Sequence, residues 1–337
     1  MKIAIISVSK KGQQLAFGLK DKLDLDSTII KCDLYYKNVK KYFPILFYEY
    51  DAIIAVMASG ILIRSVAPLI ESKVTDPAVI NIDDNGRFVI STLSGHLGGA
   101  NELANKIAGL IDATPVITTS TDVNSKLGID VLANDLYLSI DNTKEILHFN
   151  KAILEGCDIS ITINPNNNFE YLFDYLDNVT LEINVSIRFS SKVNADEMLV
   201  SFEEHELILK ERKIVVGIGC RRGKECKFIY DGLKKSLNDL KILPSRVNLL
   251  ASAEIKKDEK GILELSEKLN IPVEFVDIDK LKLFESKDVS KSDFVYSKFG
   301  IYGVCEPSAL IMAGFDSELI YKKTSYDGVT IAIAISK

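Results

Sequence analysis

Short apolar runs alternate with amphipathic segments along most of this chain, and no other feature of the sequence limits the fold as much. The run KIAIISV at residues 2–8 precedes the helix-period segment GQQLAFGLKDKL at 12–23, and AIIAVMA at 52–58 precedes GILIRSVAPLI at 60–70. Strands joined by helices of this kind form right-handed βαβ crossovers and a mostly parallel sheet. The pattern therefore predicts an N-terminal Rossmann-like α/β domain.

A turn sequence interrupts this alternation. Asp84, Asn85 and Gly86 separate the strand-like runs AVINI and RFVIST, so we expect a hairpin that makes the sheet mixed rather than wholly parallel. The helix-period segment GGANELANKIAGLI and the run TPVITT follow. We expect residues 1–125 to form this first domain.

The periodic signals weaken between residues 126 and 212, where we expect a smaller middle α/β domain that links the other two. One strand is predicted in DISITI at 158–163, followed by an asparagine-rich turn from Asn164 to Asn168, whereas SFEEHELILKER is a charged segment. A new α/β pattern opens at KIVVGIGC, continues through KECKFIYDGLKKSLNDL and closes with the hairpin-like SELIYKKTSYDGVTIAIAIS. It predicts a C-terminal three-layer α/β/α domain over residues 213–337.

Composition argues against several classes of function. The net charge is −6 and no basic stripe is interleaved with aromatic residues, which argues against nucleic-acid binding. No apolar run approaches the roughly 20 residues that span a bilayer, and the N-terminus lacks a cleavage-site pattern, so we expect a cytoplasmic protein. The five cysteines form no CxxC pair, and His96, His148 and His205 lack ligand spacing, so neither a disulfide nor a protein-bound metal is predicted.

Small and polar residues follow the strand-like run AIIAV. Ser59 is predicted to cap the next helix, Gly60 to let backbone amides approach a ligand, and Arg64 to lie one turn into the helix. A capped helix start with an arginine nearby can bind a carboxylate or a phosphate. Ordinary capping with a solvated arginine is the alternative interpretation.

The segment LSGHLGGAN at residues 93–101 is costly for stability unless the freedom of its glycines is used. His96 lies within it, and a helix start is expected to push the pKa of its imidazole toward neutrality, as suits a general base. The alternatives are that His96 only caps the turn or that it only contacts a ligand. The residues expected to approach a ligand with it are Ser94, Gly95, Gly98, Gly99 and Asn101.

A second glycine-rich turn, GIGCRRG, lies between the run KIVV and a predicted helix, where backbone amides can point at an anion. Its spacing, GxGxxxG, departs from the dinucleotide fingerprint GxGxxG, and a nucleotide-dependent reductase remains an alternative. Cys220 has no histidine near it in sequence and is interpreted as a buried thiol rather than a nucleophile. The candidate ligand-binding residues of this turn are Gly217, Gly219, Arg221, Arg222 and Gly223.

In the segment GVCEPSAL, Glu306 precedes Pro307 at the start of a predicted helix. Its carboxylate is either a general acid or base, or a group that the helix dipole stabilises. Both interpretations stay open at this point.

Together, MASGILIRSVAPLI with DPAV, LSGHLGGANELA, GIGCRRG and GVCEPSAL resemble the cobalamin biosynthesis protein CbiG family, the cobalt-precorrin-5A hydrolases of the anaerobic corrin pathway. The resemblance spans nearly the whole chain. The first and last domains carry the motifs, and the middle domain is similar by position. Cys305 departs from the small residue expected there.

The resemblance implies that the protein opens a δ-lactone on a cobalt-containing macrocycle and releases acetaldehyde to give cobalt-precorrin-5B. The cobalt then arrives with the substrate, so no further cofactor is expected. The implied partners are this small corrinoid and neighbouring enzymes of the corrin pathway. Arg64, Arg221 and Arg222 are then expected to anchor carboxylates of the macrocycle.

Our mechanistic hypothesis is that His96, or alternatively Glu306, activates a water molecule for attack on the lactone carbonyl. Backbone amides near Gly95, Gly98 and Gly99 are expected to stabilise the oxyanion. A nonenzymatic carrier of tetrapyrroles and an NADP-dependent oxidoreductase are the alternative functions.

Overall fold

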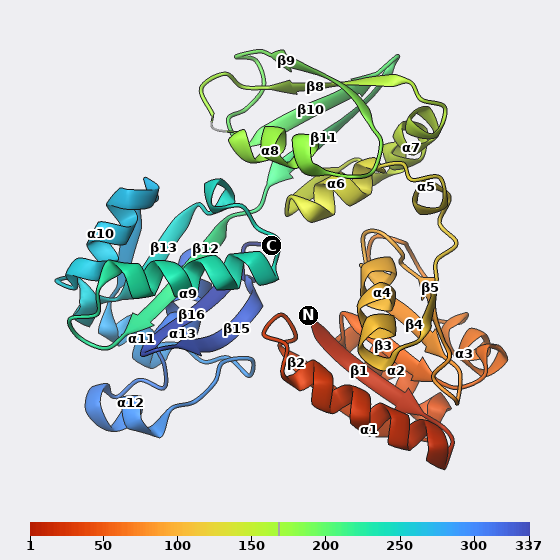
Figure 1. Ribbon diagram of the computed structural model, residues 1–337, viewed down its shortest axis with the longest axis horizontal. Helices are drawn as coiled ribbons and strands as arrows, with labels where there is room; N and C mark the ends of the chain where they lie inside the picture. The colour runs from red at the N-terminus through yellow and green to blue at the C-terminus, as the bar shows by residue number, and fades with distance from the viewer. Residues whose placement is uncertain (168) are drawn as a thin grey trace. The chain divides into compact units, whose positions relative to one another are not determined.

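The computed structural model describes residues 1–167 and 169–337, whose strands form three sheets (Figure 1). This part of the chain divides into two compact units, Met1–Asp26 with Lys31–Glu211, and Ser27–Ile30 with Arg212–Lys337. Each sheet falls within one of the three predicted domain ranges, while the boundary near residue 125 stays a prediction because both sides of it belong to one unit. Among the described residues, no helix has the length and apolar character needed to cross a membrane.

The first sheet confirms the predicted Rossmann-like arrangement. Its strand order is β2-β1-β3-β4-β5-β6, and every neighbouring pair except β4 and β5 is parallel. The strands are β1 (Lys2–Ser7), β2 (Lys31–Tyr36), β3 (Ala52–Val56), β4 (Ala78–Ile82), β5 (Phe88–Leu93) and β6 (Thr114–Val116). The helices are α1 (Lys10–Asp24), α2 (Val39–Glu49), α3 (Ser59–Val66) and α4 (Ala100–Ile111).

Burial explains why β3 is apolar throughout and why β4 is apolar except for Asn81. All five residues of each strand are buried, as expected when both faces of a parallel sheet are covered by helices. Phe43 and Leu46 of α2 pack against one face together with Leu62 of α3. The predicted hairpin is also confirmed, because β4 and β5 pair antiparallel and Gly86 adopts a φ of 68° in the turn.

The middle sheet has the strand order β7-β11-β10-β8-β9, and only β8 and β9 are parallel. Its strands are β7 (Leu138–Asp141), β8 (Asp158–Ile163), β9 (Asn184–Phe189), β10 (Glu197–Phe202) and β11 (His205–Glu211). Its helices are α5 (Ser120–Val123), α6 (Ile129–Asp135), the 3₁₀ turn η1 (Thr143–Glu145), α7 (Ile146–Leu154) and α8 (Glu170–Asn178). The strand predicted at 158–163 is β8, and the predicted turn after it is described as far as Asn167, because Asn168 lies outside the described residues.

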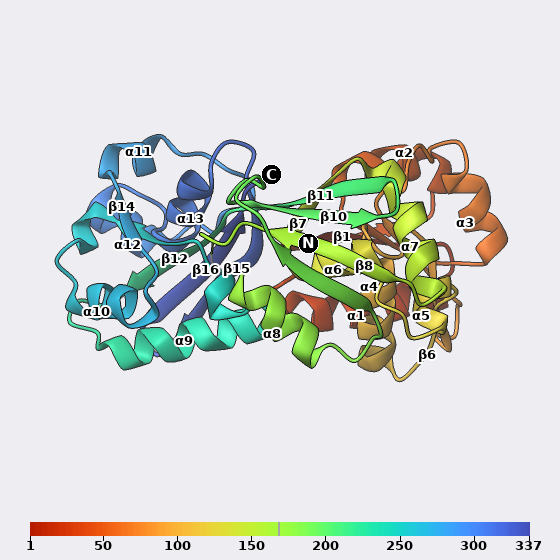
Figure 2. The same cartoon turned by 90° about the horizontal axis from the view of Figure 1, so that it is seen from above.

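The third sheet forms the middle layer of the predicted α/β/α sandwich, with α9 on one face and α13 on the other (Figure 2). The strand order is β14-β13-β12-β16-β15, in which β12, β13 and β14 are parallel and β16 is antiparallel to β12 and β15. The strands are β12 (Ile214–Cys220), β13 (Leu249–Ala253), β14 (Val273–Val276), β15 (Glu318–Tyr326) and β16 (Val329–Ile335). The helices are α9 (Cys226–Asp239), η2 (Pro244–Arg246), η3 (Glu254–Lys256), α10 (Lys260–Leu269), α11 (Ile278–Leu283), α12 (Asp293–Phe299) and α13 (Cys305–Ala313).

Candidate active site

The loop between β5 and α4 needs its glycines because the protein packs tightly against it. A Cβ at Gly95 would stand 2.8 Å from Oδ1 of Asn101, and one at Gly98 would stand 2.5 Å from Cβ of Ser94. Gly99 has a φ of 79°, in the left-handed region that glycine adopts without strain. The close approach expected at Gly95 and Gly98 is therefore made by this protein's own Asn101 and Ser94.

Backbone hydrogen bonds close this loop on itself. The N–H of Gly99 donates to the carbonyl of His96 at 2.8 Å, and the N–H of Asn101 donates to the carbonyl of Gly95 at 2.9 Å. Because the Gly99 amide already has a partner, the expectation that it stabilises an oxyanion is wrong. The same role for the amides of Gly95 and Gly98 stays a prediction.

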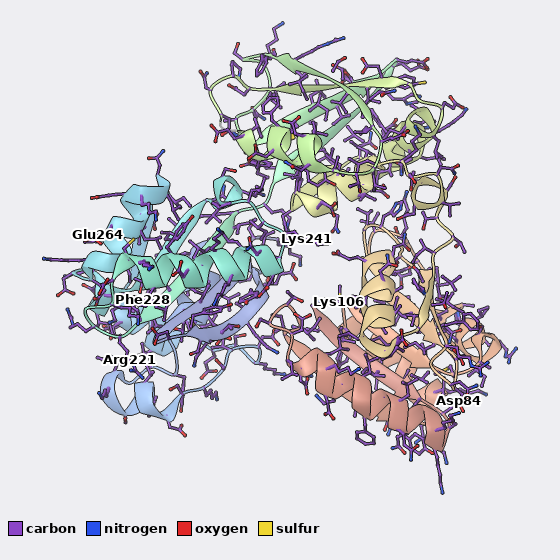
Figure 3. All side chains as sticks on the ribbon, in the orientation of Figure 1. Asp84, Lys106, Arg221, Phe228, Lys241 and Glu264 are labelled. Atoms are coloured by element: carbon purple, nitrogen blue, oxygen red, sulfur yellow. The ribbon has the colours of Figure 1, made fainter. Side chains whose placement is uncertain are left out.

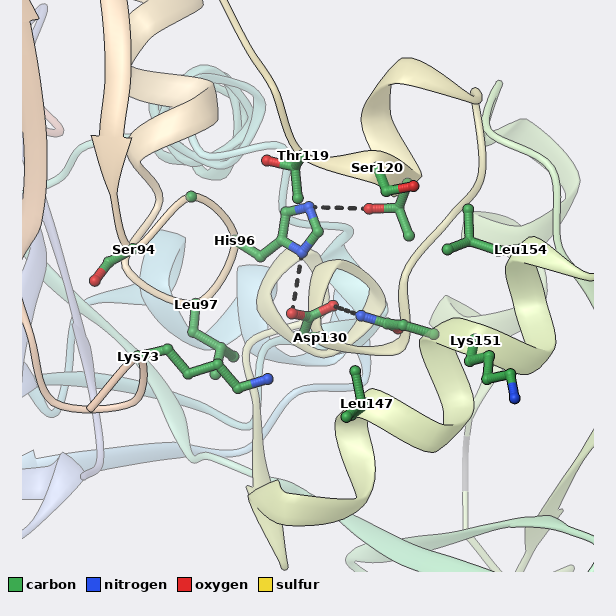
Figure 4. Close-up of a pocket in the computed structure, with 13 residues that line it drawn as sticks. Lys73, Ser94, His96, Leu97, Thr119, Ser120, Asp130, Leu147, Lys151 and Leu154 are labelled. Carbon is green, nitrogen blue, oxygen red and sulfur yellow. Dashed lines mark hydrogen bonds and ion pairs between the residues drawn. The ribbon is translucent and has the colours of Figure 1, made fainter.

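The imidazole of His96 lies between two carboxylates, Asp122 and Asp130, and Figure 4 shows the contact with Asp130. Nδ1 is 3.0 Å from Oδ2 of Asp130, and Nε2 is 2.6 Å from Oδ2 of Asp122. The hydroxyl of Thr121 is also 3.2 Å from Nε2. The side chain of His96 is only 8% exposed, compared with 31% for Asp122 and 6% for Asp130. Of the two carboxylates, Asp122 is therefore the more exposed.

These carboxylates raise the pKa of the ring. Burial alone lowers the pKa of His96, but the hydrogen bonds and charges of Asp130 and then Asp122 outweigh it, and the pKa is raised above its ordinary value. Burial likewise raises the pKa of Asp130, and the hydrogen bond and charge of His96 reverse this, so that the net shift is downward. The expectation that a helix start shifts His96 toward a neutral base is wrong, since α4 begins only at Ala100 and the two carboxylates favour the imidazolium.

Asp130 is itself held in place by α7. Its Oδ1 accepts a hydrogen bond from Nδ2 of Asn150 at 3.0 Å, and Oδ1 of Asn150 accepts one from the backbone N–H of Ile129 at 2.8 Å. The second bond fixes which end of the Asn150 amide faces Asp130. Gly128 leaves room for the pair, because a Cβ there would stand 2.8 Å from Oδ1 of Asp130.

Asn101 holds the opposite side of the site. Its Nδ2 donates to Oγ1 of Thr119 at 2.8 Å and to Oδ2 of Asp122 at 3.1 Å, and its Oδ1 accepts from the hydroxyl of Ser91 at 2.7 Å. The residue was predicted to contact a ligand. Instead, its buried amide binds protein groups and positions Asp122 beside His96.

A pocket of 590 Å³ opens beside His96 and Asp130, within the usual range for small-molecule sites (Figure 4). Leu97 from the glycine loop and Leu147 and Leu154 from α7 give it apolar walls, and the exposed Lys73 and Lys151 add positive charge. Of the predicted residues, Ser94, Gly95 and His96 line it. The full lining is Lys73, Ser94, Gly95, His96, Leu97, Thr119, Ser120, Thr121, Asp130, Leu147, Asn150, Lys151 and Leu154.

Comparison with known proteins places this chain in a family. The family described as "Cobalamin synthesis G N-terminal" matches residues 41–122, and "Cobalamin synthesis G C-terminus" matches residues 214–334. The chain is 35% identical to a protein of Methanocaldococcus jannaschii named "Probable cobalt-precorrin-5A hydrolase", over 99% of each chain. The chain belongs to the cobalamin synthesis G family. The resemblance seen in the motifs is thereby confirmed.

Two further members of the cobalamin synthesis G family are similar over nearly their full length. A protein of Priestia megaterium named "Cobalt-precorrin-5A hydrolase" is 28% identical, over 98% of this chain and 94% of that protein. The crystal structure of a cobalamin biosynthesis protein G homologue from Sulfolobus solfataricus superposes with a TM-score of 0.63 at 27% identity, over 100% of this chain and 97% of that one. The fold described above is therefore that of the family.

The motif MASGILIRSVAPLI at residues 57–70 does not form part of the pocket wall. Ser59 is the first residue of α3 rather than its cap, since Ala58 holds the cap position, and the Ser59 hydroxyl donates to Oδ1 of Asn81 at 2.5 Å. The predicted capping role is wrong because Asn81, buried beside the end of β3, already offers this hydroxyl an acceptor. The guanidinium of Arg64 lies over Gly60, where a Cβ would stand 3.5 Å from Nη1. Binding of a ligand by these residues stays a prediction.

In the second unit, the first two glycines of GIGCRRG serve packing. A Cβ at Gly217 would stand 1.9 Å from the carbonyl oxygen of Cys305, and one at Gly219 would stand 2.4 Å from Oγ1 of Thr330. Both glycines are buried within β12. Their freedom therefore lets α13 and β16 approach the strand, and the expectation that a ligand approaches there is wrong.

The remaining residues of this turn bind the protein's own carboxylates. The amide of Gly223 donates to Oε1 of the buried Glu259 at 2.5 Å, and Arg222 pairs with Asp258 at 2.7 Å. The anion expected at this turn is thus a glutamate of the same chain, which also removes support for the reductase alternative. Arg221 is exposed, with its side chain beside Gly328 (Figure 3), and its contact with substrate stays a prediction.

Glu306 is a buried structural acceptor near the start of α13. One oxygen accepts from the backbone N–H and the hydroxyl of Ser290, at 2.9 and 2.5 Å, and the other accepts from the N–H of Lys323 at 2.9 Å. This geometry favours the second of the two interpretations, a carboxylate stabilised where it lies. Burial raises the pKa of Cys305 to about 11 and also raises that of Cys220, which agrees with inert thiols.

Sequence reasoning missed the acidic partners of His96. Asp122 ends the polar run TTSTD at 118–122, which follows the strand-like run of β6. Polar residues directly after such a run were the signal that identified the other motifs, so Asp122 could have been found in the same way. Asp130 and Asn150 gave no such signal, because each lies in an ordinary amphipathic helix. Only the packing of α6 and α7 against the glycine loop brings them to the imidazole.

Proposed function

We propose that this protein is a cobalt-precorrin-5A hydrolase of cobalamin biosynthesis. It would hydrolyse the δ-lactone of the macrocycle and release acetaldehyde, giving cobalt-precorrin-5B. The names of its full-length relatives support this activity. The observation that carries the proposal is the buried His96, held between Asp122 and Asp130 in the wall of a pocket.

His96 and Asp122 are proposed to handle one proton together. Asp130 accepts the Nδ1–H and fixes the orientation of the ring, which leaves Nε2, beside Asp122 and the pocket-lining Thr121, as the nitrogen that exchanges a proton. Because the raised pKa of His96 favours its protonated form, we propose that the imidazolium acts as an acid toward the leaving oxygen of the lactone. Asp122 accepts the proton of the attacking water, and the proton count of hydrolysis is balanced.

The second stage needs the reverse transfer. The hydroxyl freed by lactone opening gives its proton to the His96–Asp122 pair as the carbon-carbon bond breaks. The electron pair of that bond passes to the macrocycle, and the two-carbon fragment leaves as acetaldehyde. Cobalt enters as part of the substrate, and we propose no separate cofactor for either stage.

Lys73 and Lys151 are proposed to contact carboxylates of the substrate. Both are exposed and line the pocket that His96 faces, whereas the predicted anchor Arg64 does not line it. A pocket of 590 Å³ would take the lactone and neighbouring side chains of the macrocycle rather than the whole ring system. Replacing either lysine by alanine should raise KM more than it lowers kcat, because the contact is the same in ground and transition states.

The test is anaerobic incubation of the purified protein with cobalt-precorrin-5A, with acetaldehyde and the mass of the corrinoid measured together. We expect acetaldehyde with a matching mass loss, and a fall of about two to four orders of magnitude in His96→Ala. Asn124→Ala is the matched control. Asn124 directly follows α5, the short helix that carries Asp122, and its Nδ2 donates only to Ser120 among the described residues. Substrate that binds unchanged would make the protein a carrier, and full turnover in His96→Ala would remove His96 from the mechanism.

A further inference from the structure

Three metal-ligating side chains meet at a second place in the first unit, outside the lining of the pocket. Glu145 ends η1, His148 lies in the first turn of α7, and His205 begins β11. One ligand atom of each residue lies within 4.8 Å of the other two. The two histidines are 57 residues apart in sequence, so their spacing gave no sign of this group.

The geometry within the group is close. Nδ1 of His205 is 2.7 Å from Oε2 of Glu145, and the rings of His148 and His205 stack with centroids 3.9 Å apart at 15°. Glu145 and His205 are partly buried, while His148 is exposed. Two of the three ligands are therefore held by the fold and the third is free to turn.

Two imidazole nitrogens and one carboxylate oxygen are a ligand set that borderline divalent metals prefer, and zinc commonly takes it with a water in the fourth position. Glu203 and Glu204 directly precede His205 and add negative charge to the same end of the sheet. We propose that Glu145, His148 and His205 form a binding site for a divalent transition metal of the zinc class. Nothing in the proposed hydrolase reaction requires this site.

Closing the site needs only a small adjustment. Ligand atoms of a tetrahedral zinc site stand about 3.3 Å apart, given metal–nitrogen distances near 2.05 Å. The widest separation allowed in this group, 4.8 Å, therefore exceeds the required one by about 1.5 Å. A bound metal lies in the plane of each imidazole, so the exposed ring of His148 has to tilt out of its stack with His205.

A metal here would join the start of α7 to the start of β11. Helix α7 also carries Asn150, which orients Asp130, and three other residues of the pocket lining. The site would thus stabilise the helix that supports His96 without touching the substrate. Its expected effect is on the stability of the first unit.

The experiment is calorimetric titration of the full-length, metal-free protein with Zn²⁺ in the presence of a phosphine reductant. We expect one equivalent of Zn²⁺ to bind, a rise in the thermal midpoint, and affinity at least about tenfold weaker in His148→Ala and in His205→Ala. Circular dichroism establishes that each variant is folded. Cys220→Ser, which removes a partly exposed thiol outside the proposed site, is the matched control and should bind as the wild type does.

Two results would overturn the proposal. The first is a folded wild-type protein that binds no Zn²⁺. The second is binding that survives both histidine substitutions, which would place the metal on cysteines or on scattered carboxylates. Titration with Co²⁺ gives an independent reading, because nitrogen and oxygen ligation should produce visible absorption without the near-ultraviolet charge-transfer band of thiolate ligation, and that absorption should vanish in His205→Ala.

Discussion

Replacing Asp130 by asparagine tests how the fold orients His96. The carboxylate accepts Nδ1–H of His96 at 3.0 Å and the amide of Asn150 at 3.0 Å. Asn150 cannot turn round without losing its bond from the N–H of Ile129 at 2.8 Å. In Asp130→Asn the new amide must therefore keep its oxygen toward Asn150 and aim its NH₂ at Nδ1, which becomes an acceptor. The proton of a neutral ring then lies on Nε2, the wrong nitrogen.

The expected losses of stability and of turnover in Asp130→Asn follow from the hydrogen bond that the charged Asp130 makes with His96. A hydrogen bond to a charged group contributes about 1.5–3 kcal/mol, so the free energy of unfolding should fall by about that amount near pH 6. The pKa of His96 should also fall, because its hydrogen bond to Asp130 is the strongest of the influences that raise it. In the serine-protease triad, the corresponding loss of the correct tautomer lowers kcat by about 10⁴-fold, and we expect a fall of about two to four orders of magnitude here.

The assay is single-turnover release of acetaldehyde from cobalt-precorrin-5A across pH, with urea unfolding of the same samples. The double variant Asp130→Asn with Asn150→Asp is the sharpest control. The carboxylate at position 150 can accept from Ile129 and from the new amide, whose oxygen then turns back to Nδ1–H. Recovery of activity in the double variant is the expected result. Wild-type turnover and an unchanged pH profile in Asp130→Asn alone would refute the reasoning.

Three further predictions concern stability. Because the folded-state pKa of His96 is raised, its contribution is fully present below its ordinary pKa of about 6.5 and is lost as pH rises through the folded value. The unfolding free energy of the wild type should therefore exceed that of His96→Asn by more at about pH 5.5 than at about pH 9, and an equal gap at both would contradict this. Gly217→Ala should lower the free energy of unfolding by about 3 kcal/mol, because its Cβ would meet a backbone oxygen at 1.9 Å. Gly18→Ala, on the open side of α1, should instead raise it by about 0.5–1 kcal/mol. Thermal unfolding of both variants would show whether the close contact at Gly217 decides the difference. Glu306→Gln should lower stability by about 1–3 kcal/mol through its three donors while the folded fraction keeps its turnover, and loss of turnover at unchanged stability would return Glu306 to the list of catalytic candidates.

Local pattern was enough to predict most of the first and third sheets. Residues 52–56 are apolar throughout, and residues 78–82 are apolar except for Asn81, because helices bury both faces of the strands they form. The middle sheet was harder, since β10 and β11 pair in an antiparallel sheet whose strands bury only alternate residues. The segment HELILKE was noted for its charges, yet Leu207 and Leu209, on either side of the partly buried Ile208, form its buried face.

The sequence also singled out the loop of the first domain that lines the pocket, because glycine and polar residues are costly there. It misread what the glycines of the two loops accommodate. At Gly95 the neighbour is Asn101, and at Gly217 it is the carbonyl of Cys305, both of which come from the same fold. Sequence alone does not distinguish a glycine that lets two elements pack closely from one that admits a ligand.

By itself, then, the sequence determined the alternation of strands and helices and the family, and it singled out His96 as a candidate, because each of these is recorded in residues that are near one another in the chain. The tertiary structure alone decided the upward shift of the pKa of His96, its two carboxylate partners and the meeting of His148 with His205. The partners of His96 lie 26 and 34 residues away, and electrostatic interactions depend on separation in space rather than along the chain. Only the packing of α6 and α7 beside the glycine loop brings these groups within hydrogen-bonding distance.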